Sequence, residues 1–242
     1  MSAPADIDLH RLPSHVGVIM DGNRRWARRQ GLEAAKGHEE GLQAAKEAVR
    51  AAVTLGIPYL SFYTFSTENW RRSAAEVSIL MGLVRRIREE FDFYREWGVR
   101  IVHSGDVEKL PDDVQTDIRA TVEYTSGFNT VVANMAINYG GRDEVLRAIS
   151  RMRTAGQWDD PASLPAEESV KKYMDQPDLP DIDLVIRTGD RYRLSNFFIW
   201  QAAYAELVFL PILWPDWKCE SFYEAVRMFQ ARPRTFGGNR TQ

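Results

Sequence analysis

Short apolar runs recur along the chain, and segments long enough to hold a helix separate them. The runs span Val16–Met20, Tyr59–Phe65, Val99–His103, Val131–Ile137 and Leu184–Ile186. Apolar runs without strict alternation are typical of strands that are buried on both faces, as in parallel sheets. The pattern therefore predicts an α/β fold with a central, mainly parallel β-sheet flanked by helices.

Helical periodicity marks two of the intervening segments. From Ala74 to Trp97 apolar residues recur at spacings of three and four, and Ser73 with Glu76 forms a capping box at the start. A second segment, Gly41–Leu55, has apolar residues on one face and ends at a Gly-Ile-Pro sequence. We expect one helix over each segment.

The rest of the chain is consistent with a single domain over residues 14–242, preceded by a short flexible lead at residues 1–13. The polar, proline-rich stretch 155–180 is linker-like but lies inside this domain. The most apolar long segment, Phe197–Leu213, is interrupted by polar residues that include Glu206. Because a charged side chain is costly inside a bilayer, we expect this segment to be core.

Composition excludes several classes of protein. The chain of 242 residues has 31 basic against 34 acidic residues and a net charge of −3, so it lacks the basic field that non-specific nucleic-acid binding requires. One cysteine and four scattered histidines provide neither a disulfide framework nor a Cys/His metal site. No signal peptide is visible at the N-terminus, and we expect a cytoplasmic protein.

Candidate chemistry begins where the first apolar run ends, at Asp21 and Gly22. In open α/β folds ligands bind at the carboxyl ends of the strands, and a glycine there allows close approach to the backbone. Four arginines follow: Arg24, Arg25, Arg28 and Arg29. The arrangement suits a diphosphate, with Mg²⁺ between it and the carboxylate. Taken alone, the motif also fits an ordinary turn followed by a solvated helix face.

Two further strand ends have similar composition. FSTENWRR follows the second apolar run, and RTGDRYRLS follows the last. Three strand ends that each place arginine beside small polar residues are hard to explain as three independent solvated faces. We therefore favour an anion-binding site over three unrelated turns.

Several motifs together resemble one family. HVGVIMDGNRRWA, Lys36-Gly37-His38-x-x-Gly41, FSTENWRR, NYGGR and DLVIRTG…RLSNFFIWQAAYAEL…LWPDW occur in order from about His15 to Gly238. They are similar to the signature regions of the cis-prenyltransferases, the family of undecaprenyl diphosphate synthase. The resemblance implies the cis-prenyltransferase fold, a homodimer and an isoprenyl diphosphate synthase, a prenyltransferase that depends on Mg²⁺.

The resemblance also implies roles for single residues. Asp21 would hold Mg²⁺ on a diphosphate, and Glu206 would support the metal region. Asn69 and Trp70 would lie near the reacting carbons, where Asn69 or a diphosphate oxygen could assist proton removal. Arg25 would act on the departing diphosphate, so Asp21, Asn69 and Arg25 are the expected catalytic residues.

The implied substrates are an allylic diphosphate (dimethylallyl, geranyl or farnesyl) and a five-carbon isoprenyl diphosphate. The expected substrate-binding residues lie at all three strand ends and on the second helix: Gly22, Asn23, Arg24, Arg25, Trp26, His38, Ser66, Glu68, Trp70, Arg72, Arg187, Arg193 and Ser195. Among these, Arg187, Arg193 and Ser195 would bind the five-carbon diphosphate. A greasy product implies transient association with a membrane surface, and no nucleic-acid partner is expected.

Four positions depart from the family pattern. Ala34 stands where an arginine usually reaches the allylic diphosphate, and Asp190-Arg191-Tyr192-Arg193 replaces the usual Gly-Glu-His-Arg or Gly-Glu-Gln-Arg. Near the C-terminus the family usually has an Arg-x-Gly motif that completes the partner subunit's site. Here Thr235 takes the place of its arginine, and Arg234 lies one residue earlier. Whether Arg191, Tyr192 and Arg234 compensate is left open by the sequence.

These departures leave two reactions equally compatible with the sequence. One is regular head-to-tail cis elongation, and the other is irregular head-to-middle coupling with dimethylallyl diphosphate as acceptor, which gives lavandulyl-type products. A third reading, a non-catalytic partner subunit, conflicts with the retained Asp21, Arg25, Arg187 and Arg193. Product length, double-bond geometry and pathway are not fixed by the sequence.

Overall fold

The computed structural model describes residues 2–158 and 164–233. Its strands form a six-stranded sheet in the order β3-β4-β2-β1-β5-β6. β1 pairs in parallel with β5, β5 with β6, and β3 with β4, which confirms the predicted α/β fold with a mainly parallel sheet. The strands are β1 His15–Ile19, β2 Tyr59–Ser66, β3 Val99–Ser104, β4 Val131–Tyr139, β5 Leu184–Arg187 and β6 Glu206–Phe209.

The chain divides into two units, each described by itself. Unit 1 comprises residues 1–60, 181–192 and 201–242, and unit 2 comprises residues 61–180 and 193–200. Both units carry residues from the predicted functional motifs. The expected single domain over residues 14–242 stays a prediction.

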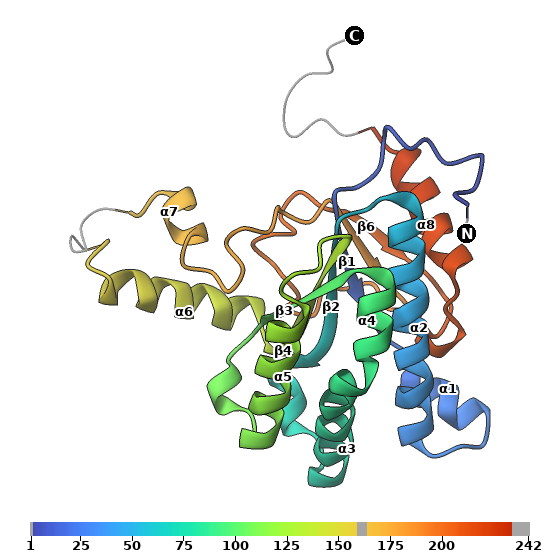
Figure 1. Cartoon of the computed structure of the whole chain (residues 1–242), viewed down its shortest axis with the longest axis horizontal. Coiled ribbons are helices and arrows are strands. Elements are labelled where there is room, and N and C mark those ends of the chain that lie inside the picture. Colours follow the sequence, from blue (N-terminus) through green and yellow to red (C-terminus); the bar gives the residue numbers. More distant parts are fainter. Residues whose placement is uncertain (1, 159–163, 234–242) are drawn as a thin grey trace. The chain divides into compact units, whose positions relative to one another are not determined.

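Unit 1 contains β1, β5 and β6 with the helices α1 Asn23–Arg29, α2 Ala34–Leu55 and α8 Cys219–Gln230, and the 3₁₀ turn η4 Trp214–Asp216. α2 and α8 lie side by side (Figure 1), and the Cys219 thiol donates a hydrogen bond to the Glu47 carboxylate at 3.1 Å between them. α2 begins at Ala34, well before the expected Gly41. The difference arises because Gly37 and Gly41, poor helix formers, lie inside this helix.

The N-terminal lead packs against α8. Ile7 is buried, Asp6 forms an ion pair with Arg227 at 2.8 Å, and Arg11 donates to the carbonyl oxygen of Gln230 at 2.9 Å. These contacts hold the segment that we expected to be flexible.

Unit 2 contains β3, β4 and most of β2. The predicted helix over 74–97 is divided into α3 Ala74–Arg85, the 3₁₀ segment η2 Arg86–Glu90 and α4 Phe91–Trp97. Ser73 caps α3 as expected, accepting a hydrogen bond from the Glu76 amide. The remaining elements are η1 Thr67–Arg71, η3 Val107–Lys109, α5 Asp112–Thr125, α6 Gly141–Thr154 and α7 Glu167–Lys171.

A single apolar cluster joins α3, α5 and the strands of unit 2. Leu80 and Val84 of α3 pack with Val114 and Ile118 of α5 above Ile137 of β4, and all five side chains are buried. The three- and four-residue spacing of these positions accounts for the packing. α3 is thereby fixed next to the end of β2, where the FSTENWRR motif begins.

The segment Phe197–Leu213 is core, as expected, and it contains a strand that the pattern did not reveal. β6, Glu206–Phe209, pairs with β5 at the edge of the sheet. Among the described residues, no helix is long and apolar enough to cross a membrane.

Candidate functional site

Asp21 lies just beyond the carboxyl end of β1, beside the residues that follow β5. The register aligns Ile19 with Arg187, so Asp21 meets Thr188 and Gly189. The Asp21 amide donates to the Thr188 hydroxyl oxygen at 3.0 Å, and that hydroxyl donates to the Asp21 carbonyl oxygen at 2.7 Å. These two hydrogen bonds join the two strand ends and fix the backbone of the Asp21 loop.

Two glycines make this close approach feasible. Gly22 has φ +117° and Gly189 has φ +83°, in the left-handed region that favours glycine. A Cβ at Gly189 would clash with the Arg25 guanidinium and lie 2.9 Å from the Asp21 carbonyl oxygen. Gly189, the glycine of the RTG motif, therefore allows the Asp21 loop and the Arg25 side chain to approach this strand end.

The Asp21 carboxylate lies between two guanidinium groups. Its Oδ1 is 3.2 Å from Arg25 Nη2, and its Oδ2 is 2.9 Å from Arg187 Nη2. Arg25 also donates to the Gly189 carbonyl oxygen at 2.5 Å. The Arg187 side chain is 5% exposed and the Asp21 side chain 30% exposed, so one carboxylate faces solvent beside two positive charges. The surplus positive charge suits an anion.

The donor set at Asp21 can share a cation with a ligand but cannot enclose one. Among the residues that the structure describes, no three His, Cys, Asp or Glu side chains gather where they could hold a metal ion. Mg²⁺ is commonly bound by one or two carboxylates together with substrate phosphates and water. A single partly exposed carboxylate therefore fits Mg²⁺ delivered with a diphosphate.

Glu206 does not share this position. The strand register aligns Ile19, Arg187 and Phe209, so Asp21 lies two residues beyond that level and Glu206 three residues before it. Glu206 instead forms an ion pair with Arg232 at 3.0 Å. The expected role of Glu206 in the metal region stays a prediction.

The start of α2 packs against the segment after Asp21. A Cβ on Gly37 would clash with the Asn23 carbonyl oxygen, and one on Gly41 would lie 2.6 Å from Asn23 Oδ1. The spacing of four residues places both glycines on one face of α2. The contacts explain the two glycines of the Lys-Gly-His-x-x-Gly pattern, and His38 is partly buried.

The other side chains of this loop differ in exposure. Arg24 is exposed on α1, whereas Trp26 is partly buried and donates from Nε1 to the Asp216 carboxylate of η4 at 2.7 Å. Trp26 therefore links α1 to η4. Arg24 and Arg25 are the basic residues nearest to Asp21 in the sequence.

We predict that Gly37→Ala lowers the free energy of unfolding by about 1–3 kcal/mol, because the new methyl group must displace the Asn23 backbone. The matched control is Gly82→Ala on α3, where a Cβ meets nothing within 4 Å. That change should be neutral or stabilising by up to about 1 kcal/mol. Urea unfolding of both variants checks this, and equal stability of the two would contradict the packing argument.

In unit 2, the FSTENWRR motif forms η1 directly after β2. The Asn69 carboxamide oxygen accepts from the Ser66 amide at 3.1 Å in a reciprocal capping box. The Asn196 amide donates to the Glu68 carboxylate at 3.0 Å. Burial opposes ionisation of Glu68, but the hydrogen bonds it receives outweigh that effect and lower its pKa. These hydrogen bonds hold η1 in place, and Glu68 is an anion at neutral pH.

Trp70 and Arg72 line a cavity of about 450 Å³. Val77 and Met81 of α3 contribute apolar wall to it, and Arg72 forms an ion pair with Glu76 at 2.8 Å. A cavity with a guanidinium at its rim and apolar walls suits a ligand with an anionic head and a hydrocarbon tail. Ser66 is 8% exposed and takes part through its hydrogen bonds with Asn69.

Arg193 and Ser195 are exposed in a loop of unit 2 with unusual backbone geometry. Ser195 has φ +53° and Asn196 has φ +65°. The Tyr63 hydroxyl donates to the Ser195 carbonyl oxygen at 3.1 Å, and the Asn196 carbonyl oxygen accepts from the Gly141 amide at 2.7 Å. Non-glycine residues in this region of φ are uncommon and concentrate at functional sites.

The structure thus brings together Asp21, Gly22, Arg25 and Arg187 within unit 1, and Ser66, Glu68, Asn69 and Trp70 within unit 2. Sequence reasoning missed the residues that hold these groups in place: Thr188, Gly189, Asn138 and Asn196. Thr188 and Gly189 lie in the RTG motif and Asn138 in NYGGR, so the motifs were visible but their supporting roles were not.

The departing positions have individual surroundings. Ala34 is the first residue of α2, and Arg191 Nη1 donates to the Asp190 carbonyl oxygen at 3.2 Å. The Tyr192 hydroxyl, on a side chain that is largely exposed, donates to the Asp190 carboxylate at 2.7 Å, and that carboxylate raises the pKa of Tyr192. Arg234 and Thr235 lie outside the described residues.

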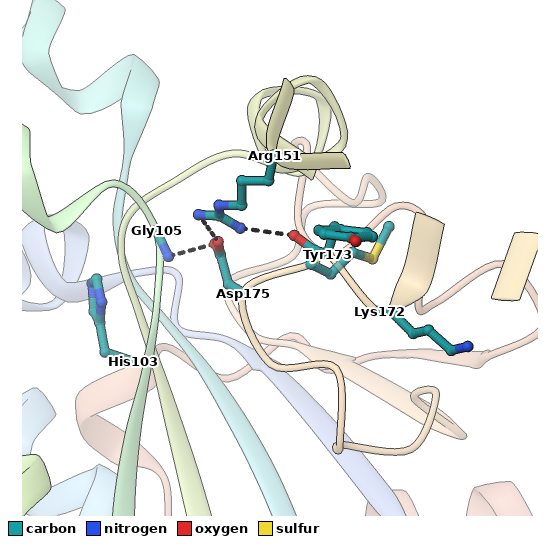
Figure 2. Close-up of a pocket in the computed structure, with 7 residues that line it drawn as sticks. His103, Gly105, Arg151, Lys172, Tyr173 and Asp175 are labelled. Carbon is teal, nitrogen blue, oxygen red and sulfur yellow. Dashed lines mark hydrogen bonds and ion pairs between the residues drawn. The ribbon is translucent and has the colours of Figure 1, made fainter. Parts of the chain in front are cut away.

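A second cavity of unit 2, of about 380 Å³, lies beside the Asp175 carboxylate (Figure 2). Asp175 receives hydrogen bonds from the Gly105 amide at 2.9 Å, from Arg147 at 2.7 Å and from Arg151 at 2.9 Å. Burial alone would raise the pKa of Asp175, but Arg147 and Arg151 outweigh it and lower the pKa. The carboxylate ties the chain after α7 to α6 and to the end of β3.

We predict that Asp175→Asn destabilises the protein by about 3 kcal/mol at neutral pH, because it leaves the half-buried Arg147 without its main counter-charge. The stability that ionised Asp175 contributes is fully present above its unfolded-state pKa of about 3.9. It is lost as pH falls through the lower pKa of Asp175 in the folded state. Chemical unfolding between pH 3 and 7 should show the gap between wild type and variant closing at acid pH. Asp113→Asn, which removes the exposed pair with Arg85, is the matched control and should cost little.

Comparisons with known proteins identify the family of the chain. Residues 19–237 match the family model described as putative undecaprenyl diphosphate synthase. An isoprenyl transferase from Treponema pallidum is 46% identical over 93% of this chain and 98% of its own length. A ditrans,polycis-undecaprenyl-diphosphate synthase, (2E,6E)-farnesyl-diphosphate specific, from Shewanella oneidensis is 42% identical over 93% of this chain and 83% of its own.

Solved structures show the same fold. A lavandulyl diphosphate synthase from Lavandula x intermedia, in complex with dimethylallyl diphosphate, has a TM-score of 0.88 and 29% identity over 94% of this chain and 99% of its own. A probable undecaprenyl diphosphate synthase from Campylobacter jejuni has a TM-score of 0.78 and 32% identity over 93% and 98%.

The fold and the sequence similarity are those of an isoprenyl diphosphate synthase. The chain belongs to the undecaprenyl diphosphate synthase family, the cis-prenyltransferases, and is a prenyltransferase.

Proposed function

We propose that the protein couples an allylic diphosphate with a five-carbon isoprenyl diphosphate and releases diphosphate, with Mg²⁺ as cofactor. The observation that carries the proposal is the Asp21 carboxylate held between Arg25 and Arg187 at paired strand ends. Regular elongation with isopentenyl diphosphate is the first candidate, because relatives at 42–46% identity are named isoprenyl transferases or an undecaprenyl diphosphate synthase.

The unit 1 residues would bind and stabilise the leaving diphosphate. As the allylic C–O bond breaks, negative charge grows on the diphosphate oxygens, and the guanidinium of Arg25 stabilises that charge. Gly22 and Asn23 offer backbone amides, while Arg24 and His38 extend the basic surroundings. Mg²⁺ held by Asp21 would neutralise charge on the same oxygens.

Arg187 has a distinct role in this proposal. It is buried and already neutralises one oxygen of Asp21, so it contributes both to the acceptor's diphosphate and to the orientation of the Asp21 carboxylate. Arg193 and Ser195 would bind the same acceptor diphosphate. Both residues are exposed.

The unit 2 residues would contact the carbon skeleton. Trp70, Val77 and Met81 would exclude water from the allylic carbons, which water would otherwise capture. The Asn69 oxygen is engaged by the Ser66 amide, so its amide nitrogen is the group offered to a ligand as a donor. This favours a diphosphate oxygen, rather than Asn69, as the proton acceptor.

Assembly and location belong to the same proposal. The protein would act as a homodimer in the cytoplasm and would associate transiently with a membrane surface when its product is long. The support is family membership, and no partner chain enters the geometry above.

We predict that Asp21→Asn lowers Mg²⁺-dependent turnover at least 100-fold, because the amide cannot neutralise the cation shared with the diphosphate. Asparagine is chosen over alanine because it keeps the shape of the aspartate side chain and one oxygen atom next to the buried Arg187. Glu206→Gln is the matched control, and its Mg²⁺ titration should follow that of the wild type. Wild-type turnover in Asp21→Asn would refute the metal role, and a shifted Mg²⁺ optimum in Glu206→Gln would restore one to Glu206.

A second candidate reaction is irregular coupling with dimethylallyl diphosphate as acceptor. It is favoured by the altered Asp190–Tyr192 segment, where the Tyr192 hydroxyl is bonded to Asp190, and by the likeness to lavandulyl diphosphate synthase. The two reactions differ in whether isopentenyl diphosphate is consumed.

We predict that product forms from labelled farnesyl, geranyl or dimethylallyl diphosphate only when isopentenyl diphosphate and Mg²⁺ are present. Mass spectrometry gives the product length and NMR the branching. A branched product from dimethylallyl diphosphate alone would decide for irregular coupling. No product from any combination, with the protein folded, would favour a non-catalytic partner subunit.

A further inference from the structure

Asn138, in the NYGGR motif, has an environment that the proposed roles above do not use. It is the penultimate residue of β4, it is 2% exposed, and its φ is +51°. A buried carboxamide in the left-handed region of φ is an unusual feature for a strand, and asparagine is among the few residues that tolerate it. The position therefore calls for a reason beyond packing.

Both ends of the Asn138 side chain are engaged. Its Nδ2 donates to the Asp106 carbonyl oxygen at 2.8 Å, and the Asp106 amide donates to the Asn138 carbonyl oxygen at 3.1 Å. Gly105 makes this approach feasible, because a Cβ there would lie 2.9 Å from the Asn138 carbonyl oxygen. Asn138 is thus fixed to the loop after β3.

The remaining polar atom of Asn138 reaches η1. Its Oδ1 accepts a hydrogen bond from the Trp70 indole Nε1 at 2.8 Å. Trp70 also contacts Phe65 edge to face, with ring centroids 5.0 Å apart, yet its side chain is 39% exposed and lines the 450 Å³ cavity. One edge of the indole is therefore anchored while the rest of the ring is available to a ligand.

The same strand end supports the rest of η1. A Cβ on Gly140 would lie 2.7 Å from Thr67 Oγ1 and 2.8 Å from Asn196 Nδ2, and Asn196 in turn bonds Glu68. η1 is thus held along its length by the end of β4 and by Asn196. Of these contacts, the hydrogen bond to Asn138 and the edge-to-face contact with Phe65 involve the Trp70 ring itself.

We propose that Asn138 is a positioning residue for the coupling reaction: by holding the Trp70 indole N–H it sets the ring plane that contacts the allylic substrate. The inference rests on the proposed function for the role of Trp70. The indole N–H that donates this hydrogen bond lies at the edge of the ring. Loss of the bond would therefore free the Trp70 ring to rotate without removing apolar area from the cavity wall. Affinity for the allylic substrate should fall, while binding of the five-carbon diphosphate should not.

The test is a double-mutant cycle on Trp70→Phe and Asn138→Gly. Phenylalanine removes the indole N–H, and glycine accepts φ +51° but has no carboxamide. Each single variant should raise KM for the allylic diphosphate about three- to tenfold, as loss of one hydrogen bond implies, with KM for isopentenyl diphosphate within twofold. In the double variant, KM for the allylic diphosphate should be no higher than in the single variant with the higher KM. Multiplied losses in the double variant, or wild-type KM in Asn138→Gly, would overturn the proposal.

Two further variants separate positioning from stability. Asn138→Asp keeps an acceptor oxygen for the indole N–H but loses the donor to Asp106, so it should retain the allylic KM within twofold even where Tm falls. Trp97→Phe removes an indole N–H elsewhere in unit 2 and should leave all kinetic constants within twofold. A raised allylic KM in Asn138→Asp equal to that in Asn138→Gly would reduce Asn138 to a structural residue and overturn the proposal.

A readout without turnover distinguishes this failure from that of the proposed function. The seven tryptophans give seven indole N–H signals in a ¹⁵N-labelled protein, and Trp70→Phe identifies one of them. Farnesyl thiodiphosphate, which binds without reacting, should shift that signal in the wild type and not in Asn138→Gly. A wild type that shifts but does not turn over would contradict the proposed function alone. No difference between wild type and Asn138→Gly would contradict the role of Asn138.

Discussion

The ion pairs of Asp21 with Arg25 and Arg187 are the interaction on which the unit 1 part of the site depends. Arg187 is buried at the end of β5, where a guanidinium without a counter-charge would be costly. Asp21 provides that counter-charge only because the Thr188 hydrogen bonds and the left-handed Gly189 bring the two strand ends together. The parallel register of β1 and β5 thus determines which charges meet.

Glycine determines how closely the supporting elements approach. Gly37 and Gly41 bring α2 against Asn23, and Gly189 admits the Arg25 guanidinium. In unit 2, Gly105 and Gly140 allow equally close contacts around the end of β4. At each position a methyl group would occupy space already taken by a backbone or polar atom, so these glycines are packing residues as much as turn residues.

Much of this arrangement was predictable, because it follows from local pattern. The five predicted strands match β1 to β5 within two residues, and the residues at their carboxyl ends include Asp21, Arg187 and the η1 motif. Hydrophobic runs report strands that are buried on both faces. The edge strand β6 was not predicted, because it has only four residues and begins with the charged Glu206, so its apolar run is short.

Other features depend on tertiary contacts that the sequence does not display. The early start of α2 contradicts the low helix propensity of glycine, since packing on Asn23 favours glycine there. The expectation for Glu206 came from resemblance alone, and only the strand register shows that it lies at another level of the sheet than Asp21. Likewise, NYGGR was recognised as a motif, but the contact between Asn138 and Trp70 joins residues 68 positions apart.

The charges around Asp21 account for a carboxylate between two arginines. Without it, Arg25 and Arg187 would repel one another, and the buried Arg187 would lack its counter-charge. With it, the diphosphate of the proposed reaction would meet a negative charge that already engages the two guanidinium groups. Under the proposed function, a divalent cation held by Asp21 would neutralise part of the diphosphate charge and leave Arg25 and Arg187 to the remaining phosphate oxygens. Under the proposed function, the residue that orders these charges before binding would therefore also favour binding of the diphosphate together with a cation.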